Sequence, residues 1–145
     1  MSKRLQTESD DTIEQVDEIA QRLFGVTERM RKNFQETCDS FDLTAAQART
    51  LLALNDRAPM RNLSDVLQCD ASNVTGIADR LEAKDLVRRE TSASDRRVTL
   101  LAITPKGERV RRRLQESINA SSPINVKLSA AEQTTLGDLL AKLDT

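Results

Sequence analysis

Several short polar side chains and one arginine lie together on one face of the helix that the sequence predicts over residues 71–84. The residues on this face are Ser72, Asn73, Thr75, Gly76, Asp79 and Arg80. Hydroxyl and amide groups of this size suit base edges in a DNA major groove, and a glycine allows close approach of another backbone. The alternative interpretation is an ordinary solvated helix face.

A basic loop follows the helix. SASDRR joins two segments, LVRRET and VTLLAIT, that are typical of strands. Successive side chains in an extended segment alternate sides, so Asp95 and Arg97 point one way and Arg96 the other. We expect the Asp95 carboxylate to pair with the Arg97 guanidinium and hold it extended. Such an arginine suits the negative potential of a minor groove, and Arg88 and Arg89 would lie near phosphates. A solvated arginine turn is the alternative.

The elements around these residues predict a winged helix-turn-helix. Asp70 is a good N-cap for the helix, whose other face is apolar and must be buried, with Val74, Ile77, Ala78 and Leu81. A shorter helix over residues 60–68 and a turn at Cys69-Asp70 complete a helix-turn-helix. Arg61 and Ser64 near the start of the shorter helix are candidate phosphate contacts, because helix N-termini favour anions.

At these residues the chain resembles the MarR family of winged-helix regulators. The matching segments are Asp95-Arg96-Arg97, VTLLA, Ile103 to Gly107, Ala78 to Glu82, Cys69 to Thr75 and Phe41 to Thr44. The resemblance covers about residues 10–143. Asp85 departs from it, because many members have glycine there; aspartate tolerates a left-handed backbone better than most residues.

The resemblance implies one MarR-type domain over residues 1–145, mainly α in class (α+β), with a two-stranded β-wing. Residues 42–104 would bind DNA, and helices over residues 10–40 and 105–145 would form a homodimer. Two copies of helix 71–84 would then read the major groove about one turn, roughly 34 Å, apart on an inverted-repeat operator. The wing over residues 92–97 would enter the minor groove. The resemblance further implies a repressor released by a small aromatic or phenolic ligand.

Capping patterns set the other boundaries. Ser9, Asp10 or Asp11 is expected to start a long amphipathic helix that ends before Phe41. A Thr44–Gln47 capping box opens a helix that stops before Pro59. Thr104 and Pro105 begin a helix that breaks at Ser121-Ser122-Pro123, and a third box at residues 128–132 begins the last helix. The outer helices carry apolar stripes that need a covering partner, either an intramolecular cap or a second copy. The family resemblance implies the second copy.

Composition alone does not exclude an enzyme, but nothing in the sequence indicates one. The 145 residues include no histidine, four glycines and two cysteines, and no glycine-rich phosphate loop or nucleophile elbow is present. We expect no cofactor and no metal. The net charge is −1, yet residues 80–113 carry 11 basic and 5 acidic side chains, which favours a local polyanion site. Without a signal peptide or a membrane-length apolar run, a soluble cytoplasmic protein is expected.

Two alternatives remain open at the sequence level. Cys69, beside the cap of the recognition helix, is a candidate thiol sensor together with Cys38, although both residue types are more often plain core. A winged helix is also used as a protein-interaction module that does not bind DNA. A steep loss of DNA affinity with salt would separate the DNA-binding interpretation from that module.

Overall fold

The structure is a computed structural model that describes residues 2–67 and 71–144, with side chains described from Ile13 onward except at positions 66, 71 and 72. The chain divides into two compact units. One unit is Phe34–Ser121, and the other combines Met1–Asn33 with Ser122–Thr145. The two units are described separately below.

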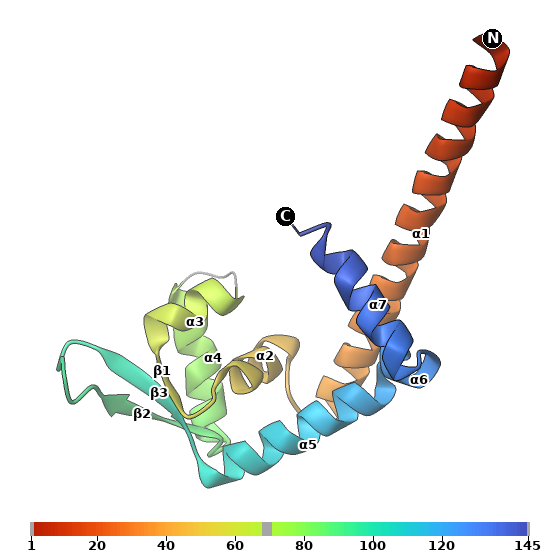
Figure 1. Cartoon of the computed structure of the whole chain (residues 1–145). Helices are drawn as coiled ribbons and strands as arrows, with labels where there is room; N and C mark the ends of the chain where they lie inside the picture. The colour runs from red at the N-terminus through yellow and green to blue at the C-terminus, as the bar shows by residue number, and fades with distance from the viewer. Residues whose placement is uncertain (1, 68–70, 145) are drawn as a thin grey trace. The chain divides into compact units, whose positions relative to one another are not determined.

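The first unit contains the predicted helix-turn-helix and its wing (Figure 1). It holds the last turns of α1 (Ser2–Ser40), followed by α2 (Ala45–Ala53), β1 (Arg57–Pro59), α3 (Met60–Leu67), α4 (Ala71–Ala83), β2 (Val87–Thr91), β3 (Thr99–Ile103) and α5 (Pro105–Ser121). In Figure 1 the β2–β3 hairpin extends to one side of α3 and α4. The mainly helical winged-helix prediction is confirmed.

The sheet has three strands, one more than the two predicted. The strand order is β1-β3-β2 and both pairings are antiparallel. In the hairpin Val87 pairs with Ile103 and Thr91 with Thr99, whereas β1 sets Arg57 opposite Ala102 and Pro59 opposite Leu100. The sequence did not reveal β1 because three residues ending in proline carry no alternating pattern. Proline is tolerated there because β1 is an edge strand.

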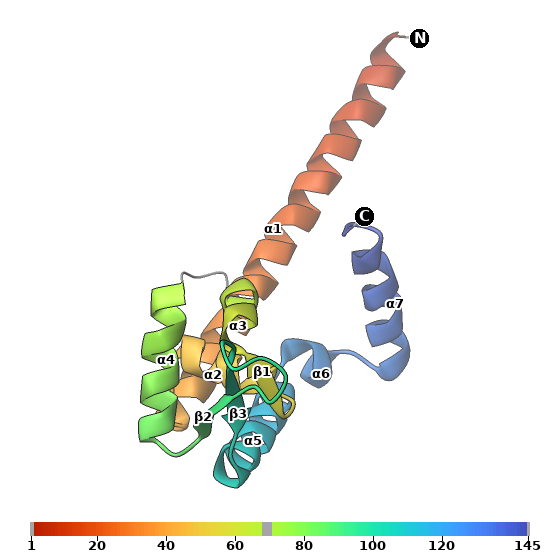
Figure 2. The same cartoon turned by 90° about the vertical axis from the view of Figure 1, so that its left-hand side faces the viewer.

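One apolar core packs α4 and the β2–β3 hairpin together. Leu51 of α2, Leu81 of α4, Leu101 of β3 and Leu114 of α5 are all fully buried in one cluster, and Leu63 of α3 is 2% exposed. Figure 2 shows α4 standing beside α2 with the sheet and α5 next to them. Since five elements contribute to the same cluster, the DNA-candidate side chains are presented by a packed scaffold.

Capping and a left-handed turn set the joints of this unit. Thr44 and Gln47 form the predicted capping box of α2. Thr104 Oγ1 accepts a hydrogen bond from the Gly107 N–H at 2.9 Å, as expected for the cap of α5. Asp85 has a φ of 58°, so the chain adopts the left-handed conformation that its sequence position predicted. At Gly107 a Cβ would overlap the Leu86 carbonyl oxygen.

The second unit is helical. It contains most of α1, together with α6 (Pro123–Lys127) and α7 (Ala130–Ala141). The Ser129–Glu132 capping box of α7 is present as predicted. Large apolar side chains of this unit remain exposed, with Ile13 at 65%, Phe24 at 73% and Leu143 at 72%. Among the residues described, no helix combines the length and the apolar character needed to cross a membrane.

Two helix boundaries differ from the prediction in this unit. The first helix already begins at Ser2, so Ser9, Asp10 and Asp11 lie inside it and do not start it. Residues 3–8 (KRLQTE) contain no glycine or proline, and nothing there terminates a helix. The short α6 was not predicted. Pro123 starts it after Ser122, in the position where a proline fits a helix.

Candidate nucleic-acid interface

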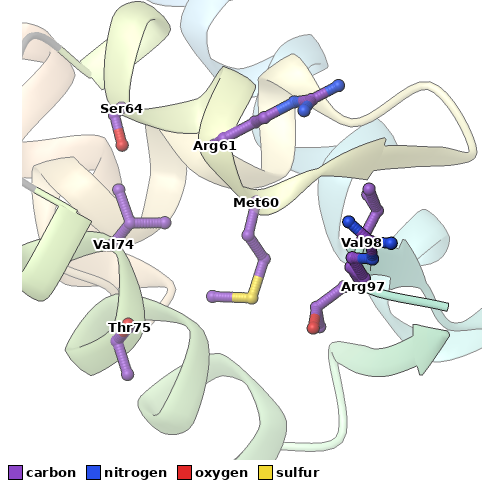
Figure 3. Close-up of a pocket in the computed structure, with 8 residues that line it drawn as sticks. Met60, Arg61, Ser64, Val74, Thr75, Arg97 and Val98 are labelled. Carbon is purple, nitrogen blue, oxygen red and sulfur yellow. The ribbon is translucent and has the colours of Figure 1, made fainter. Parts of the chain in front are cut away.

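A cavity lies between the helix-turn-helix and the wing. It has a volume of about 350 Å³ and is lined by Met60, Arg61, Ser64, Val74, Thr75, Arg97, Val98 and Thr99. Figure 3 shows the Met60 side chain reaching into the middle of this space, while the Arg61 side chain extends away from it. Four of the predicted site residues, Arg61, Ser64, Thr75 and Arg97, are therefore brought together from α3, α4 and the hairpin.

A second cavity follows another face of α4. It measures about 320 Å³ and is lined by Thr44, Ala46, Arg49, Leu67, Asn73, Gly76, Ile77 and Arg80. Three predicted site residues, Asn73, Gly76 and Arg80, meet here, and the exposed Arg49 of α2 lies with them. The sequence analysis missed Arg49 because nothing local in α2 indicates which of its faces lies beside α4.

The wing turn is built differently from the prediction. Asp95 Oδ1 accepts a hydrogen bond at 3.0 Å from the backbone N–H of Arg97, in place of the expected pair with the Arg97 guanidinium. A carboxylate two residues before an N–H readily forms such a turn. The Val98 N–H donates to the Asp95 carbonyl at 3.0 Å. Arg96 and Arg97 are exposed, and within the described residues no ion pair engages either guanidinium.

Arg88 and Arg89, which were predicted to lie near phosphates, both form ion pairs with carboxylates of the chain. The Arg88 Nε donates to Glu90 Oε1 at 2.7 Å. Arg89 turns back onto α4, where its guanidinium binds the Asp79 and Glu82 carboxylates. The sequence analysis missed the pairs of Arg89 because Asp79 and Glu82 are ten and seven residues before it. Strand alternation alone does not reveal a contact with a preceding helix.

The recognition helix presents the remaining predicted residues on its surface. Asn73 and Thr75 are exposed. Apart from the two chain neighbours and the nearby backbone of α4, no atom of the described residues lies within 4 Å of the position that a Cβ on Gly76 would occupy. Arg80 is exposed, and for the side chains that the structure describes it forms no ion pair with Asp79 or Glu82. Ser72 lies in the first turn of α4, but its side chain is outside the described set, as is Asp70 altogether.

The environment of Cys38 does not favour a reactive thiol. Cys38 is fully buried, and burial, reinforced by the neighbouring Asp39 carboxylate, raises the pKa of its thiol. A raised pKa leaves less of the nucleophilic thiolate at neutral pH. Cys69, the other predicted redox candidate, lies outside the described residues.

An exposed polar helix face, a basic hairpin and a helix-turn-helix define a winged helix-turn-helix DNA-binding protein. The sequence model of the MarR family matches residues 43–99. The repressor NicR of Pseudomonas putida is 27% identical over 92% of this chain and 84% of its own length. The transcriptional regulator MgrA of Staphylococcus aureus is 30% identical over 71% of each chain.

Among solved structures, a mutant of E. coli MarR complexed with operator DNA superposes with a TM-score of 0.68 and 24% identity, covering 89% of this chain and 95% of the other. The chain belongs to the MarR family. It is a transcription regulator with a winged-helix DNA-binding fold, and its family and relatives are regulators, not enzymes.

Proposed function

We propose that this regulator binds an inverted-repeat operator as a homodimer, with α4 in the major groove and the wing over residues 92–97 in the minor groove. The observation that carries the proposal is the cavity that gathers Arg61, Ser64, Thr75 and Arg97 on one face. Side chains that contact base edges and phosphates of adjacent grooves must lie on one face of the protein.

Roles follow from chemistry and exposure. Asn73 and Thr75 would hydrogen-bond base edges, with Ser72 beside them and Gly76 allowing close approach. Arg61 and Ser64 of α3, Arg80 of α4 and Arg49 of α2 would contact phosphates, which position the protein without reading sequence. Arg97 would enter the minor groove, and Arg96 and Arg88 would contact the phosphates on either side of it. Asp95 would hold the turn through its hydrogen bond to the Arg97 N–H.

A second copy of the chain is the partner proposed for the helical unit. Its exposed apolar side chains include Ile13, Val16, Phe24 and Leu143. Val26 of α1 and Leu136 and Leu139 of α7 also line a mainly apolar cavity of about 520 Å³. Apolar surface on this scale marks an interaction site. We assign residues 10–40 and 105–145 to dimerisation and residues 42–104 to DNA binding, within one MarR-type domain.

Repression released by a small ligand is proposed for the regulatory response. The support is the relative NicR, which is named a transcriptional repressor. The ligand class, a small aromatic or phenolic compound, rests on the family resemblance. With three phenylalanines and no tryptophan or tyrosine in the chain, arginines that bind a carboxylate would contribute much of the recognition.

Footprinting on the DNA that flanks the protein's own coding region tests the function. We expect protection of an inverted repeat whose half-sites lie about one helical turn apart. Operator affinity should fall steeply between about 50 and about 200 mM salt, because phosphate contacts release counterions. A flat salt response with no protected site would contradict the proposal. The thiol-sensing and protein-module alternatives gain no support from the relatives.

A further inference from the structure

Arg89 of β2 binds three groups of the recognition helix at once. Its Nη2 lies 2.6 Å from Asp79 Oδ1 and 3.3 Å from the Thr75 carbonyl oxygen. Its Nη1 donates to Glu82 Oε2, and its backbone N–H donates to Glu82 Oε1 at 3.0 Å. With 27% of its side chain exposed, Arg89 is the most enclosed of the arginines in the strand and the wing.

The three groups lie along one face of α4. Thr75, Asp79 and Glu82 are spaced by four and three residues, which places them one above another on a helix. Thr75 also lines the cavity proposed to face DNA, so Asp79 lies one turn farther along the same row. The Asp79 side chain is 61% exposed and that of Glu82 is 40% exposed.

Two carboxylates on a DNA-reading helix work against its function. Like charges that are brought together unpaired at an interface weaken binding, and DNA carries a phosphate on each strand at every step. Within the described residues, Arg89 is the cation that forms ion pairs with both carboxylates. Burial opposes the charged form of Arg89, but the hydrogen bonds to Asp79 and Glu82 outweigh it and raise the pKa of the guanidinium.

We propose that Arg89 is a positioning residue for DNA binding that acts through the recognition helix: it neutralises Asp79 and Glu82 and holds their row of α4 against β2. It does not contact phosphate itself. The inference rests on the proposed function and refines it, because it moves one arginine of the wing region out of the set of direct DNA contacts.

Charge removal separates this role from a phosphate contact. We expect Arg89→Ala to weaken operator binding by about tenfold, since it unmasks two carboxylates. In a chain that also carries Asp79→Asn and Glu82→Gln, the same Arg89→Ala change should cost little, because no negative charge is left to unmask. Arg89→Lys, which keeps the charge, should bind better than Arg89→Ala.

The salt dependence gives a second readout, which separates masking from a direct phosphate contact. Loss of one direct phosphate contact lowers the slope of log affinity against log salt by about 0.9. A masking residue leaves the number of contacted phosphates, and hence the slope, unchanged. Arg111→Ala is the matched control, because Arg111 is 25% exposed and paired with Glu108 on α5. Arg111 belongs to the Phe34–Ser121 unit, whereas the apolar side chains proposed to meet a second copy belong to the helical unit. Arg111→Ala should bind the operator like the wild type.

The outcomes are distinct. If Arg89→Ala costs as much in the Asp79→Asn/Glu82→Gln background and lowers the salt slope, Arg89 touches phosphate and the inference is overturned. Thermal melting and circular dichroism identify variants that fail to fold. If Arg89→Ala is one of these, the triple variant is compared with Asp79→Asn/Glu82→Gln: equal affinity and an equal salt slope support masking, and a loss of affinity with a lower slope overturns it. Failure of the wild type to bind DNA would instead contradict the proposed function.

Discussion

Substitution of Gly76 would separate the stability of α4 from its contact with DNA. It lies inside α4, where glycine destabilises a helix relative to alanine. Beyond the neighbouring backbone of α4, no atom of the described part of the chain lies within 4 Å of the place of its missing Cβ. Gly76→Ala should therefore raise the free energy of unfolding by about 0.5–1 kcal/mol. The added methyl group should at the same time weaken operator binding. Urea denaturation and operator titration measure the two effects, and unchanged affinity would remove Gly76 from the interface.

Arg97 is exposed at the wing tip, with its backbone fixed by Asp95. Arg97→Ala should weaken operator binding most where the flanks of the site are A·T-rich, because narrow minor grooves concentrate negative potential. Titration of operators with A·T-rich and G·C-rich flanks measures the difference. Equal losses on both flanks would mean that Arg97 contacts phosphates only, and no loss would contradict the assignment of the wing.

Arg49 and Arg113 form a matched pair of surface arginines. Each guanidinium lies 5.7 Å from a phenylalanine ring centroid, Arg49 over Phe34 and Arg113 over Phe41, but only Arg49 lines the cavity beside Asn73 and Arg80. Arg49→Ala should reduce binding to operator and random DNA alike and lower the salt slope by about 0.9. Arg113→Ala should change stability similarly and leave the slope unchanged.

At the scale of elements, Gly107 fixes the joint between α5 and the turn before β2. A Cβ on Gly107 would overlap the Leu86 carbonyl oxygen and press on Ile103. Gly107→Ala should therefore destabilise the winged unit by roughly 1–3 kcal/mol, as overpacking does. Urea denaturation measures this loss. The opposite signs expected for Gly76→Ala and Gly107→Ala, both inside helices, make the two variants controls for each other.

Local signals predicted the elements whose sequences contain them. Capping boxes at Thr44 and Ser129, the Thr104-Pro105 helix start and the left-handed Asp85 all have short-range causes and are confirmed. The strand β1 owes its conformation to pairing with β3, about 45 residues away in sequence. Its three residues, Arg57 to Pro59, have no strand pattern of their own.

The candidate site divides in the same way. The sequence predicted a polar helix face and a basic wing from the residue types of Asn73, Thr75 and Arg97. These three residues are exposed in the structure. The partners of Arg89 and the position of Arg49 depend on how β2 and α2 pack against α4. Such contacts between separate elements are set by the packed core, and no single stretch of sequence encodes them.

At the scale of the whole molecule, the apolar side chains of the helical unit predict assembly. Phe24 is 73% exposed and lies on α1 among Val16, Leu23 and other apolar residues. Phe24→Glu should place a charge in the proposed dimer interface, lower the dimer fraction and weaken operator binding, because each copy then binds a single half-site. Analytical ultracentrifugation measures assembly. A dimer as stable as that of the wild type would contradict the proposed interface.

The three-stranded sheet has a consequence for the proposed association of two copies of the chain. Its outer strand β1 is three residues long and ends in Pro59, which has no N–H to offer, and the other outer strand, β2, carries Arg88, Arg89 and Glu90 in succession. Short, charged or proline-bearing borders discourage strand recruitment from a neighbouring molecule. Pairing of sheet edges between two copies is therefore disfavoured. Contacts between copies would instead be made by side chains on the helices.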